Sequence, residues 1–301
     1  MSAAAPDAGA RAAIGRAVLL AVASTALFSC MHAAVRHVGH ELHPFMVAFF
    51  RSLFGVVAIA PVVLRTGVTV ALRTRNPRLL LLRAALGAVS LLTWFYGLTL
   101  VPIAEATALS FSAAIFASIG AVVFLGERMG VRRWSAVAVG FLGALVVLRP
   151  GVEAVQLGSM LVLLSAVCWG GSIVLVKAIS RTDATVTIVV WMAILLTVAT
   201  FFPALAVWQW PNPIQLAWLA AIGLLGTIGT FAWTSAIKAA DATLIIPTDF
   251  TRLLWASLIG YLAFTEVPDP WTWVGGAMIL GSTFYIALRE AHLARVPAAR
   301  P

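Results

Sequence analysis

Ten apolar segments that carry few charges divide this chain, and the connections between them are short. We place them at residues 16–36, 43–64, 77–99, 102–125, 131–149, 156–178, 184–208, 213–237, 242–264 and 270–288. Each is about as long as the ~20 apolar residues that cross bilayer hydrocarbon. Because lipid offers no partner to the backbone, such segments must be helices, and the alternating ten-residue strands of a membrane barrel are absent. The sequence predicts an all-α integral membrane protein with ten transmembrane helices.

The balance of residue types supports this class and predicts an orientation. Hydrophobic residues make up 62% of the chain and charged residues only 10%, against about 25% charged in soluble domains. If the N-terminus is cytoplasmic, 16 of the 20 basic residues fall in cytoplasmic loops and tails, as the positive-inside rule requires. The net charge of +9 then needs no nucleic acid. We expect a multi-pass protein of the bacterial inner membrane with both termini in the cytoplasm.

The two halves of the chain resemble each other. At an offset of 139 residues Trp94 falls on Trp233 and Glu127 on Glu266, and at an offset of 141 Arg36 falls on Lys177. This divides the chain into a cytoplasmic tail (1–15), a first repeat (16–150), a second repeat (156–288) and a second cytoplasmic tail (289–301). Five spans in each half make the second repeat enter the membrane from the opposite side. Inverted repeats of this kind are typical of transporters.

Charged residues inside the predicted spans are the sharpest signals, because a charge at the bilayer centre costs a few kcal/mol. Asp249 and Arg252 lie three residues apart near the middle of span nine and share one helix face. One interpretation is that they only neutralise each other. The other is a substrate site, because Pro247 interrupts the helix beside them and transporters place ligands at broken helices. Their counterparts in the first repeat are Ser110 and Ala113, so the scaffold does not require the pair.

Further candidates surround this pair in the prediction. Arg51 and Glu105 are expected charge partners within spans two and four, with Asp249 as the alternative partner of Arg51. Aromatic and hydroxyl side chains complete the expected substrate-binding set, with bundle packing as the other interpretation of the aromatic ones: Trp94, Tyr96, Ser110, Trp169, Trp233 and Thr248.

Motifs of catalysis are missing from the sequence. It has no Walker A loop, no His-Glu-x-x-His and no Gly-x-Ser-x-Gly. Four histidines between residues 32 and 43 lack the cysteines or carboxylates that would complete a metal site. Cys30 and Cys168 fall inside spans, and we expect no disulfide. The sequence predicts neither an enzyme nor a cofactor or metal, with a membrane-embedded enzyme as the alternative of another class.

Three stretches resemble a known family. His43 to Phe54, Trp94 to Ala108, and Leu125-Gly126-Glu127-Arg128 with Arg149-Pro150-Gly151 are similar to the drug/metabolite transporter superfamily. The resemblance is to its ten-span members with two EamA repeats. It implies a secondary carrier that works by alternating access, without a cofactor, on amino acids, riboflavin, S-adenosylmethionine, opine-type metallophores or other small metabolites.

The substrate expectation combines the family with the charged pair. Asp249 could face an ammonium group and Arg252 a carboxylate, which suits a zwitterion. We therefore expect an exporter of amino acids or amino-acid-derived metabolites, including opine-type metallophores. The direction comes from the family. The alternative is uptake of riboflavin, S-adenosylmethionine or a similar metabolite. Asp249 is also the candidate carrier of a coupling proton. The expected partners are a small-molecule substrate and the lipid bilayer.

Overall fold

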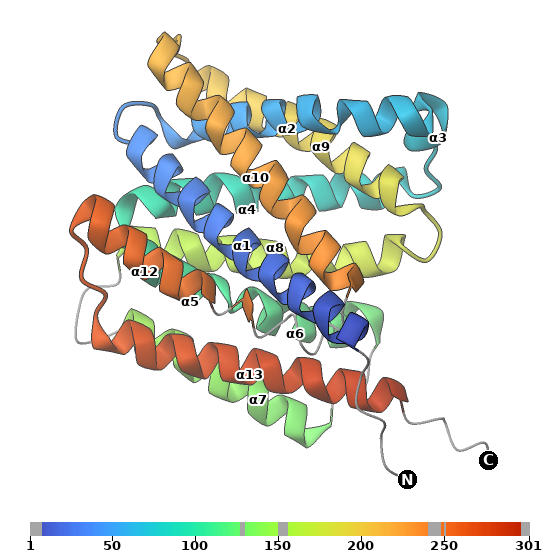
Figure 1. The fold of residues 1–301 in the computed structure, drawn as a ribbon, viewed down its shortest axis with the longest axis vertical. Helices are drawn as coiled ribbons and strands as arrows, with labels where there is room; N and C mark the ends of the chain where they lie inside the picture. The colour runs from blue at the N-terminus through green and yellow to red at the C-terminus, as the bar shows by residue number, and fades with distance from the viewer. Residues whose placement is uncertain (1–7, 127–129, 150–155, 240–247, 250, 296–301) are drawn as a thin grey trace.

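The computed structural model describes residues 8–126, 130–149, 156–239, 248–249 and 251–295. The described residues form helices and connections, and no strand occurs among them. Figure 1 shows the helices stacked roughly parallel to one another, with α1 and α10 crossing the front of the bundle. The helices are α1 (Ala8–Val38), α2 (Pro44–Thr66), α3 (Val68–Leu72), α4 (Pro77–Leu100), α5 (Ile103–Ser110), α6 (Ala113–Leu125), α7 (Val131–Leu148), α8 (Leu157–Ile179), α9 (Thr185–Ala206), α10 (Pro213–Ala239), α12 (Thr251–Phe264) and α13 (Pro270–Arg295).

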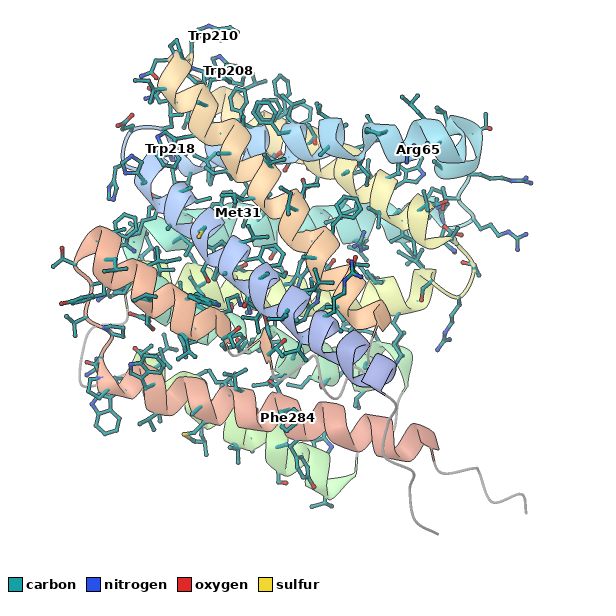
Figure 2. All side chains as sticks on the ribbon, viewed as in Figure 1. Met31, Arg65, Trp208, Trp210, Trp218 and Phe284 are labelled. Atoms are coloured by element: carbon teal, nitrogen blue, oxygen red, sulfur yellow. The ribbon has the colours of Figure 1, made fainter. Side chains whose placement is uncertain are left out.

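Seven of the described helical stretches are long and apolar enough to cross a membrane, and two shorter apolar helices accompany them, Trp134–Leu148 and Thr251–Phe264. Many large apolar side chains point outward; Phe124 is 79% exposed and Leu262 72%. Figure 2 shows such side chains over the outside of the bundle. A surface this apolar fits hydrocarbon rather than water. The chain is therefore a multi-pass helical membrane protein.

Proline and capping residues explain several helix starts. Pro44, Pro77, Pro213 and Pro270 each occupy the first position of a helix, where a missing N–H costs nothing. Before Pro213, the N–H of Gln215 donates to Asn212 Oδ1 at 2.8 Å, and the N–H of Asn212 donates to Gln215 Oε1 at 2.9 Å. This reciprocal arrangement is a capping box. The predicted helix starts at these prolines are confirmed to within a residue.

The helices differ from the predicted spans at several points. The first helix, α1, begins at Ala8 rather than at residue 16, and α13 runs to Arg295 rather than to 288. Two further differences are new or broken helices. The segment after span two, expected to be a loop, contains the five-residue helix α3. Span four, expected to run unbroken over 102–125, is interrupted by a turn at Phe111 and Ser112 between α5 and α6. No proline marks this turn; hydroxyl groups do, because Ser110 Oγ donates to Thr107 O at 2.7 Å and Ser112 Oγ to Leu109 O at 2.6 Å. Side chains of this kind compete with the helix for its own carbonyls.

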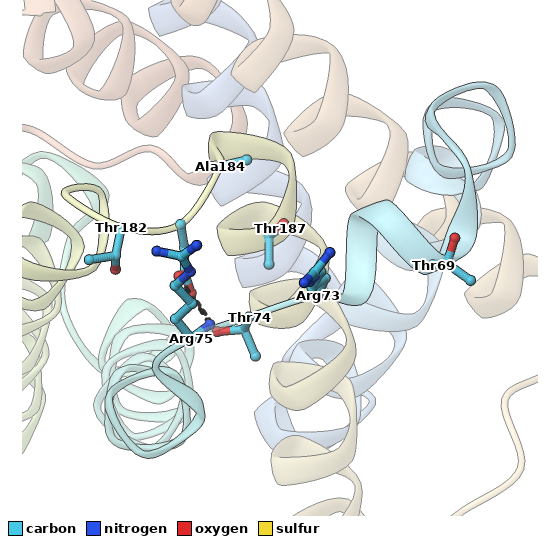
Figure 3. Close-up of a pocket in the computed structure, with 8 residues that line it drawn as sticks. Thr69, Arg73, Thr74, Arg75, Thr182, Ala184 and Thr187 are labelled. Carbon is cyan, nitrogen blue, oxygen red and sulfur yellow. Dashed lines mark hydrogen bonds between the residues drawn. The ribbon is translucent and has the colours of Figure 1, made fainter.

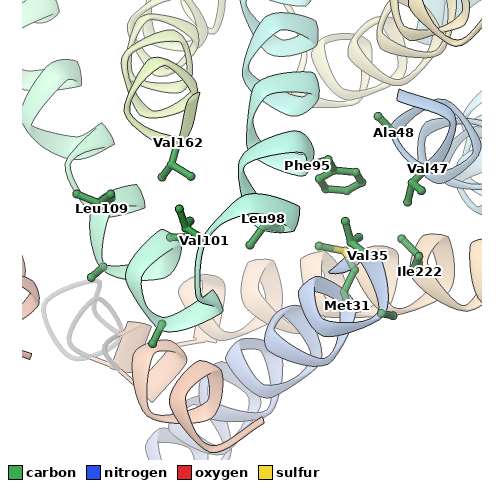
Figure 4. Close-up of a cluster of buried hydrophobic side chains, with 14 of the residues drawn as sticks. Met31, Val35, Val47, Ala48, Phe95, Leu98, Val101, Leu109, Val162 and Ile222 are labelled. Carbon is green, nitrogen blue, oxygen red and sulfur yellow. The ribbon is translucent and has the colours of Figure 1, made fainter. Parts of the chain in front are cut away.

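Helices far apart in sequence pack together. The most extensive contacts join α4 to α8, α1 to α10 and α7 to α13, followed by α6 to α8, α2 to α9, α2 to α10 and α1 to α12. Between them lies a continuous apolar core, part of which is drawn in Figure 4. There Phe95 and Leu98 of α4 meet Val35 of α1, and all three are at most 1% exposed. The core thus ties both halves of the chain into one bundle.

Aromatic side chains gather at one end of the bundle. Trp208, Trp210 and Trp218 lie at the end where α9 meets α10 (Figure 2). Trp208 packs against Phe49 and Phe50 of α2, with ring centroids 5.9 and 6.0 Å apart, while Trp210 is 84% exposed. Tryptophan prefers the depth of the lipid headgroups. This end therefore fits a membrane–water boundary.

Candidate functional site

The ion pair expected in span nine is formed. Arg252 Nη2 donates to Asp249 Oδ2 at 3.2 Å. Thr248 and Asp249 lie in 3₁₀ conformation just before α12 begins at Thr251. The side chains of Arg252 and Asp249 are 21% and 29% exposed, so both keep surface that a ligand could contact. Pro247, the residue expected to interrupt the helix, lies outside the described residues.

The interruption of span four faces this ion pair. The guanidinium carbon of Arg252 lies 4.8 Å from the centroid of the Phe111 ring, at the turn between α5 and α6. An arginine at this distance over an aromatic face gains a cation–π interaction. Phe111 is 5% exposed. The adjacent candidate Ser110 donates its hydroxyl proton to Thr107 O. Toward a ligand its hydroxyl oxygen can therefore accept a hydrogen bond but not donate one. An aromatic ring at the α5–α6 turn of the first repeat thus stabilises the Arg252 guanidinium of the second repeat.

A row of polar side chains on α1 also contacts this region, and the sequence analysis did not identify it. Thr25, Ser29 and His32 recur at spacings of four and three residues, which places them on one helix face. Thr25 Oγ1 shares a hydrogen bond with Thr251 Oγ1 at 2.7 Å, and Ser29 Oγ donates to the backbone oxygen of Arg252 at 3.3 Å. The available signal was polar residues at helical spacing within an apolar span.

His32 brings the predicted Trp94 into this neighbourhood. The two rings meet edge to face, with centroids 5.1 Å apart and planes at 69°. His32 is 6% exposed, and no described group bonds its Nδ1. Arg51 and Arg252 both act electrostatically on this ring. The imidazole therefore lies among positive charges and keeps one nitrogen available.

Arg51 does not form the ion pairs expected for it. Among the described residues it pairs with neither carboxylate: Asp249 pairs with Arg252, and Glu105 accepts a hydrogen bond from Ser159 Oγ at 2.6 Å. Arg51 Nε is buried, and no described group bonds it. Its guanidinium lies beside Gly226 of α10, where an added Cβ would be 3.7 Å from Nε. Two arginines and one aspartate leave this region with an excess of positive charge.

The remaining aromatic candidates lie elsewhere. Tyr96 contacts the rings of His43 and Phe45, with centroids 5.6 and 6.0 Å away, at the start of α2. Trp233 packs on a small cluster formed by α1 and α10. Trp169 on α8 is 47% exposed. Of the four aromatic candidates, the structure brings only Trp94 next to the His32 ring.

The arrangement can bind and orient a solute but offers no evident covalent chemistry. Among the described residues no group of three or more His, Cys, Asp or Glu side chains converges on a metal position. What converges is an ion pair, a second arginine, an imidazole and two aromatic faces. Such groups recognise charge and flat rings. The fold defines a multi-pass helical membrane protein, and the candidate site places charged and aromatic groups between its helices.

Comparison with known proteins gives the family. Residues 15–149 and residues 156–288 each match the EamA-like transporter family. The chain belongs to this family, within the drug/metabolite transporter superfamily, and its two EamA repeats cover almost the whole sequence. It is therefore a transporter of small molecules across a membrane.

Curated relatives carry several substrate names. A riboflavin transporter of Rhizobium johnstonii is 36% identical over 252 residues, which cover 83% of each chain. An S-adenosylmethionine uptake transporter of Rickettsia felis is 31% identical, over 85% of this chain and 86% of its own. The pseudopaline exporter CntI of Pseudomonas aeruginosa is 31% identical, over 87% of this chain and 93% of its own. The family is therefore clear, and the names of its members differ in substrate and direction.

The fold also matches a solved structure. A crystal structure with 18% sequence identity covers 92% of this chain and 98% of its own, with a TM-score of 0.62. At this identity the likeness concerns the arrangement of helices alone.

Proposed function

We propose that the protein is a secondary carrier that takes up a flat heteroaromatic metabolite, with riboflavin as the first candidate and S-adenosylmethionine as the second. The supporting observation is a chain of aromatic and cationic contacts: Trp94 meets the His32 ring, Arg51 and Arg252 act electrostatically on it, and Arg252 lies over Phe111. Relatives named for riboflavin and for S-adenosylmethionine uptake, at 36% and 31% identity, agree with this choice.

The chemistry of riboflavin fits these groups. Its ring system presents carbonyl oxygens and ring nitrogens along one edge, which accept hydrogen bonds from guanidinium groups such as Arg51 and Arg252. Its face can stack on Trp94 or Phe111. S-adenosylmethionine offers an adenine ring for the same faces and an amino-acid end for Asp249 and Arg252. In this proposal Ser110 contributes an acceptor oxygen at the turn between α5 and α6, and Thr248 contributes one just before α12.

Export of an amino-acid-derived zwitterion, the expectation from the charged pair, is the second candidate. The relative named as a pseudopaline exporter favours it. The charged groups alone do not separate the candidates, because riboflavin carries no charge and S-adenosylmethionine has an amino-acid end of its own. Several similar relatives are named for riboflavin or for S-adenosylmethionine uptake. We therefore rank uptake above export.

The transport mechanism that we propose is alternating access between two inverted repeats of five spans each. The support comes from helix contacts that occur in matching pairs: α1 packs on α10 as α8 packs on α4, and α1 meets α12 as α8 meets α6. In each case the two helices of the first contact correspond, in the other repeat, to the two helices of the second contact. We propose ten spans with both termini in the cytoplasm of a bacterial inner membrane, from the distribution of basic residues.

A flux assay with purified protein in liposomes tests the proposal. We expect saturable entry of labelled riboflavin that excess unlabelled riboflavin abolishes, and weaker flux of S-adenosylmethionine. Flux of amino acids without either of these solutes would instead support the exporter. Absence of flux for all three classes, from protein that is folded and inserted, would contradict a role as carrier of these metabolites. A pH gradient across the same liposomes reports whether a proton is coupled, with Asp249→Asn as the matched variant.

A further inference from the structure

A polar cavity opens at the end of the bundle that we assign to the cytoplasm, well apart from the candidate substrate site. It measures about 730 Å³ and lies between the α3–α4 connection and the start of α9. Its lining is almost entirely basic or hydroxylic: Thr69, Arg73, Thr74, Arg75, Thr182, Asp183, Ala184 and Thr187. Figure 3 shows the guanidinium groups of Arg73 and Arg75 on either side of Thr187. Two arginines and several hydroxyl groups around one opening suit an anion.

The one carboxylate in this lining is already occupied. Asp183 accepts hydrogen bonds from the Thr74 hydroxyl and, at 3.1 Å, from the backbone N–H of Arg75. Desolvation alone would raise the pKa of Asp183, but hydrogen bonds from Thr74, Arg75, Thr182 and Asn76 outweigh it and hold the pKa below its usual value. Asp183 thus stays ionised and anchors the loop of both arginines to the α8–α9 connection. It fixes their position, and the lining still holds two guanidinium groups against one carboxylate.

The start of α9 adds to the attraction for an anion. Ala184 directly precedes this helix of 22 residues, and Thr187 lies in its first turn. The first N–H groups of a helix have no partner within it and carry partial positive charge. Both residues line the cavity, so this helix end and the two arginines act on the same space.

Exposed apolar residues lie close in the chain to the lining residues Thr69 and Arg73. Leu64, Val68 and Leu72, at the end of α2 and on α3, are 74%, 49% and 36% exposed. Trp191 of α9 donates from Nε1 to the backbone oxygen of Leu72 at 3.0 Å, which fixes α3 against the bundle. A soluble anion would gain no binding energy from exposed leucine and valine side chains beside its site. A lipid would, because its acyl chains can cover these side chains while its headgroup enters the cavity.

We propose that this cavity binds the phosphate group of an anionic phospholipid from the cytoplasmic leaflet. Arg73 and Arg75 hold the phosphate oxygens, the α9 N-terminus and Thr187 face the same charge, and α3 lies under the acyl chains. The bound lipid holds the α3–α4 connection against the α8–α9 connection. A free phosphate ion shares the headgroup chemistry, and the experiment separates the two sources.

The test is thermal unfolding of the detergent-purified full chain with phosphatidylglycerol, phosphatidylcholine or inorganic phosphate added at equal phosphate concentration. We expect a saturable rise in Tm with phosphatidylglycerol and little change with the other two. Arg73→Gln/Arg75→Gln should weaken the apparent affinity at least about tenfold, since two charge-assisted contacts are lost. The control Arg132→Gln/Arg133→Gln removes the same charge at the start of α7, outside the lining, and should stay within about twofold of the parent.

Each other outcome counts against the proposal. Equal rises with phosphatidylcholine would show that any lipid suffices. A full effect of inorganic phosphate alone would make the cavity a site for soluble anions. Equal losses in the two double variants would reduce the effect to unspecific surface charge. If Arg73→Gln/Arg75→Gln fails to insert, Arg73→Lys/Arg75→Lys and the two single variants replace it. The Lys variant should retain most of the affinity, because lysine still binds phosphate as a point charge, and the single variants should lose part of it.

Discussion

Arg36 and Glu266 form an ion pair between the two halves of the chain, with Arg36 Nη2 lying 2.5 Å from Glu266 Oε1. The other carboxylate oxygen accepts the backbone N–H of Ile103 at 3.0 Å, the first residue of α5. Arg36 Nη1 also donates to the backbone oxygens of Leu98 and Val101 at the end of α4. One glutamate therefore caps α5 and binds α1, and the arginine closes the end of α4.

Removal of this carboxylate should destabilise the whole bundle. Glu266→Ala leaves a partly buried guanidinium without its counter-charge and an uncapped N–H at α5, and we expect a loss of about 3 kcal/mol. Glu266→Gln keeps an acceptor for Ile103 and should lose less. Thermal unfolding in detergent measures both. An alanine variant as stable as the glutamine variant would mean that the cap contributes nothing.

Glu266 shows which of these contacts the sequence could predict and which it could not. Its recurrence as Glu127, and the matching positions of Arg36 and Lys177, indicated a repeat with paired features. They did not indicate that Glu266 pairs with Arg36, because that contact depends on how helices pack across 230 residues of chain. Glu127 lies outside the described residues.

The sequence predicted the charged residues of the candidate site but not the helix turn that packs against them. Asp249 and Arg252 stand out because a charge is costly in an apolar span. The interruption at Phe111 was missed because hydroxyl groups, not a proline, produce it. Trp169 is 47% exposed on α8, and its place near substrate stays a prediction, because an aromatic residue in an apolar helix gives no sign of the direction it faces.

Neutralising the central pair separates binding from charge balance. Asp249→Asn/Arg252→Gln removes both charges of the pair together, so neither partner is left buried alone and the protein should insert and fold normally. If the pair binds substrate, flux should fall at least about tenfold, the equivalent of one good charge-assisted contact. Flux is measured in liposomes at matched protein amount. Transport close to that of the parent would remove both residues from the site.

His32 gives an independent test of the same site. Its free Nδ1 and its contact with Trp94 put it beside the proposed ligand. His32→Phe keeps a flat ring against Trp94 but removes both nitrogens, so we expect weaker riboflavin uptake with little loss of stability. Ser165→Ala is the control, because Ser165 is also buried but bonds Ser90 between α4 and α8. Equal effects of the two variants on flux would argue against a role of His32 in binding.

The contact between α7 and α13 depends on the absence of side chains at two glycines. A Cβ on Gly275 would lie 2.5 Å from the backbone oxygen of Gly143 and 2.5 Å from Val147 Cγ2. Backbone cannot give way as a flexible side chain can, so Gly275→Ala should cost about 1–3 kcal/mol. Gly281 on the same helix has nothing within 4 Å of an added Cβ. Gly281→Ala should be neutral or stabilising by up to ~1 kcal/mol, and equal losses in both variants would refute the packing argument.

The start of α2 should make stability depend on pH. The N–H of Phe45 donates to His43 Nδ1 at 3.3 Å, which requires the neutral imidazole, and desolvation lowers the pKa of His43. A lowered pKa in the folded state means that the unfolded chain takes up its proton first. The stability from this group is therefore complete above the unfolded pKa of about 6.5 and is lost as the pH falls through the folded value.

A variant at this position isolates that contribution from the other histidines. Asn is a good N-cap that accepts the same hydrogen bond without titrating. His43→Asn should therefore match the parent near pH 7.5 and become the more stable of the two near about pH 5. Thermal unfolding of both proteins across this range measures the difference. Parallel pH profiles would mean that His43 is protonated equally in the folded and unfolded states, against the cap seen in the structure.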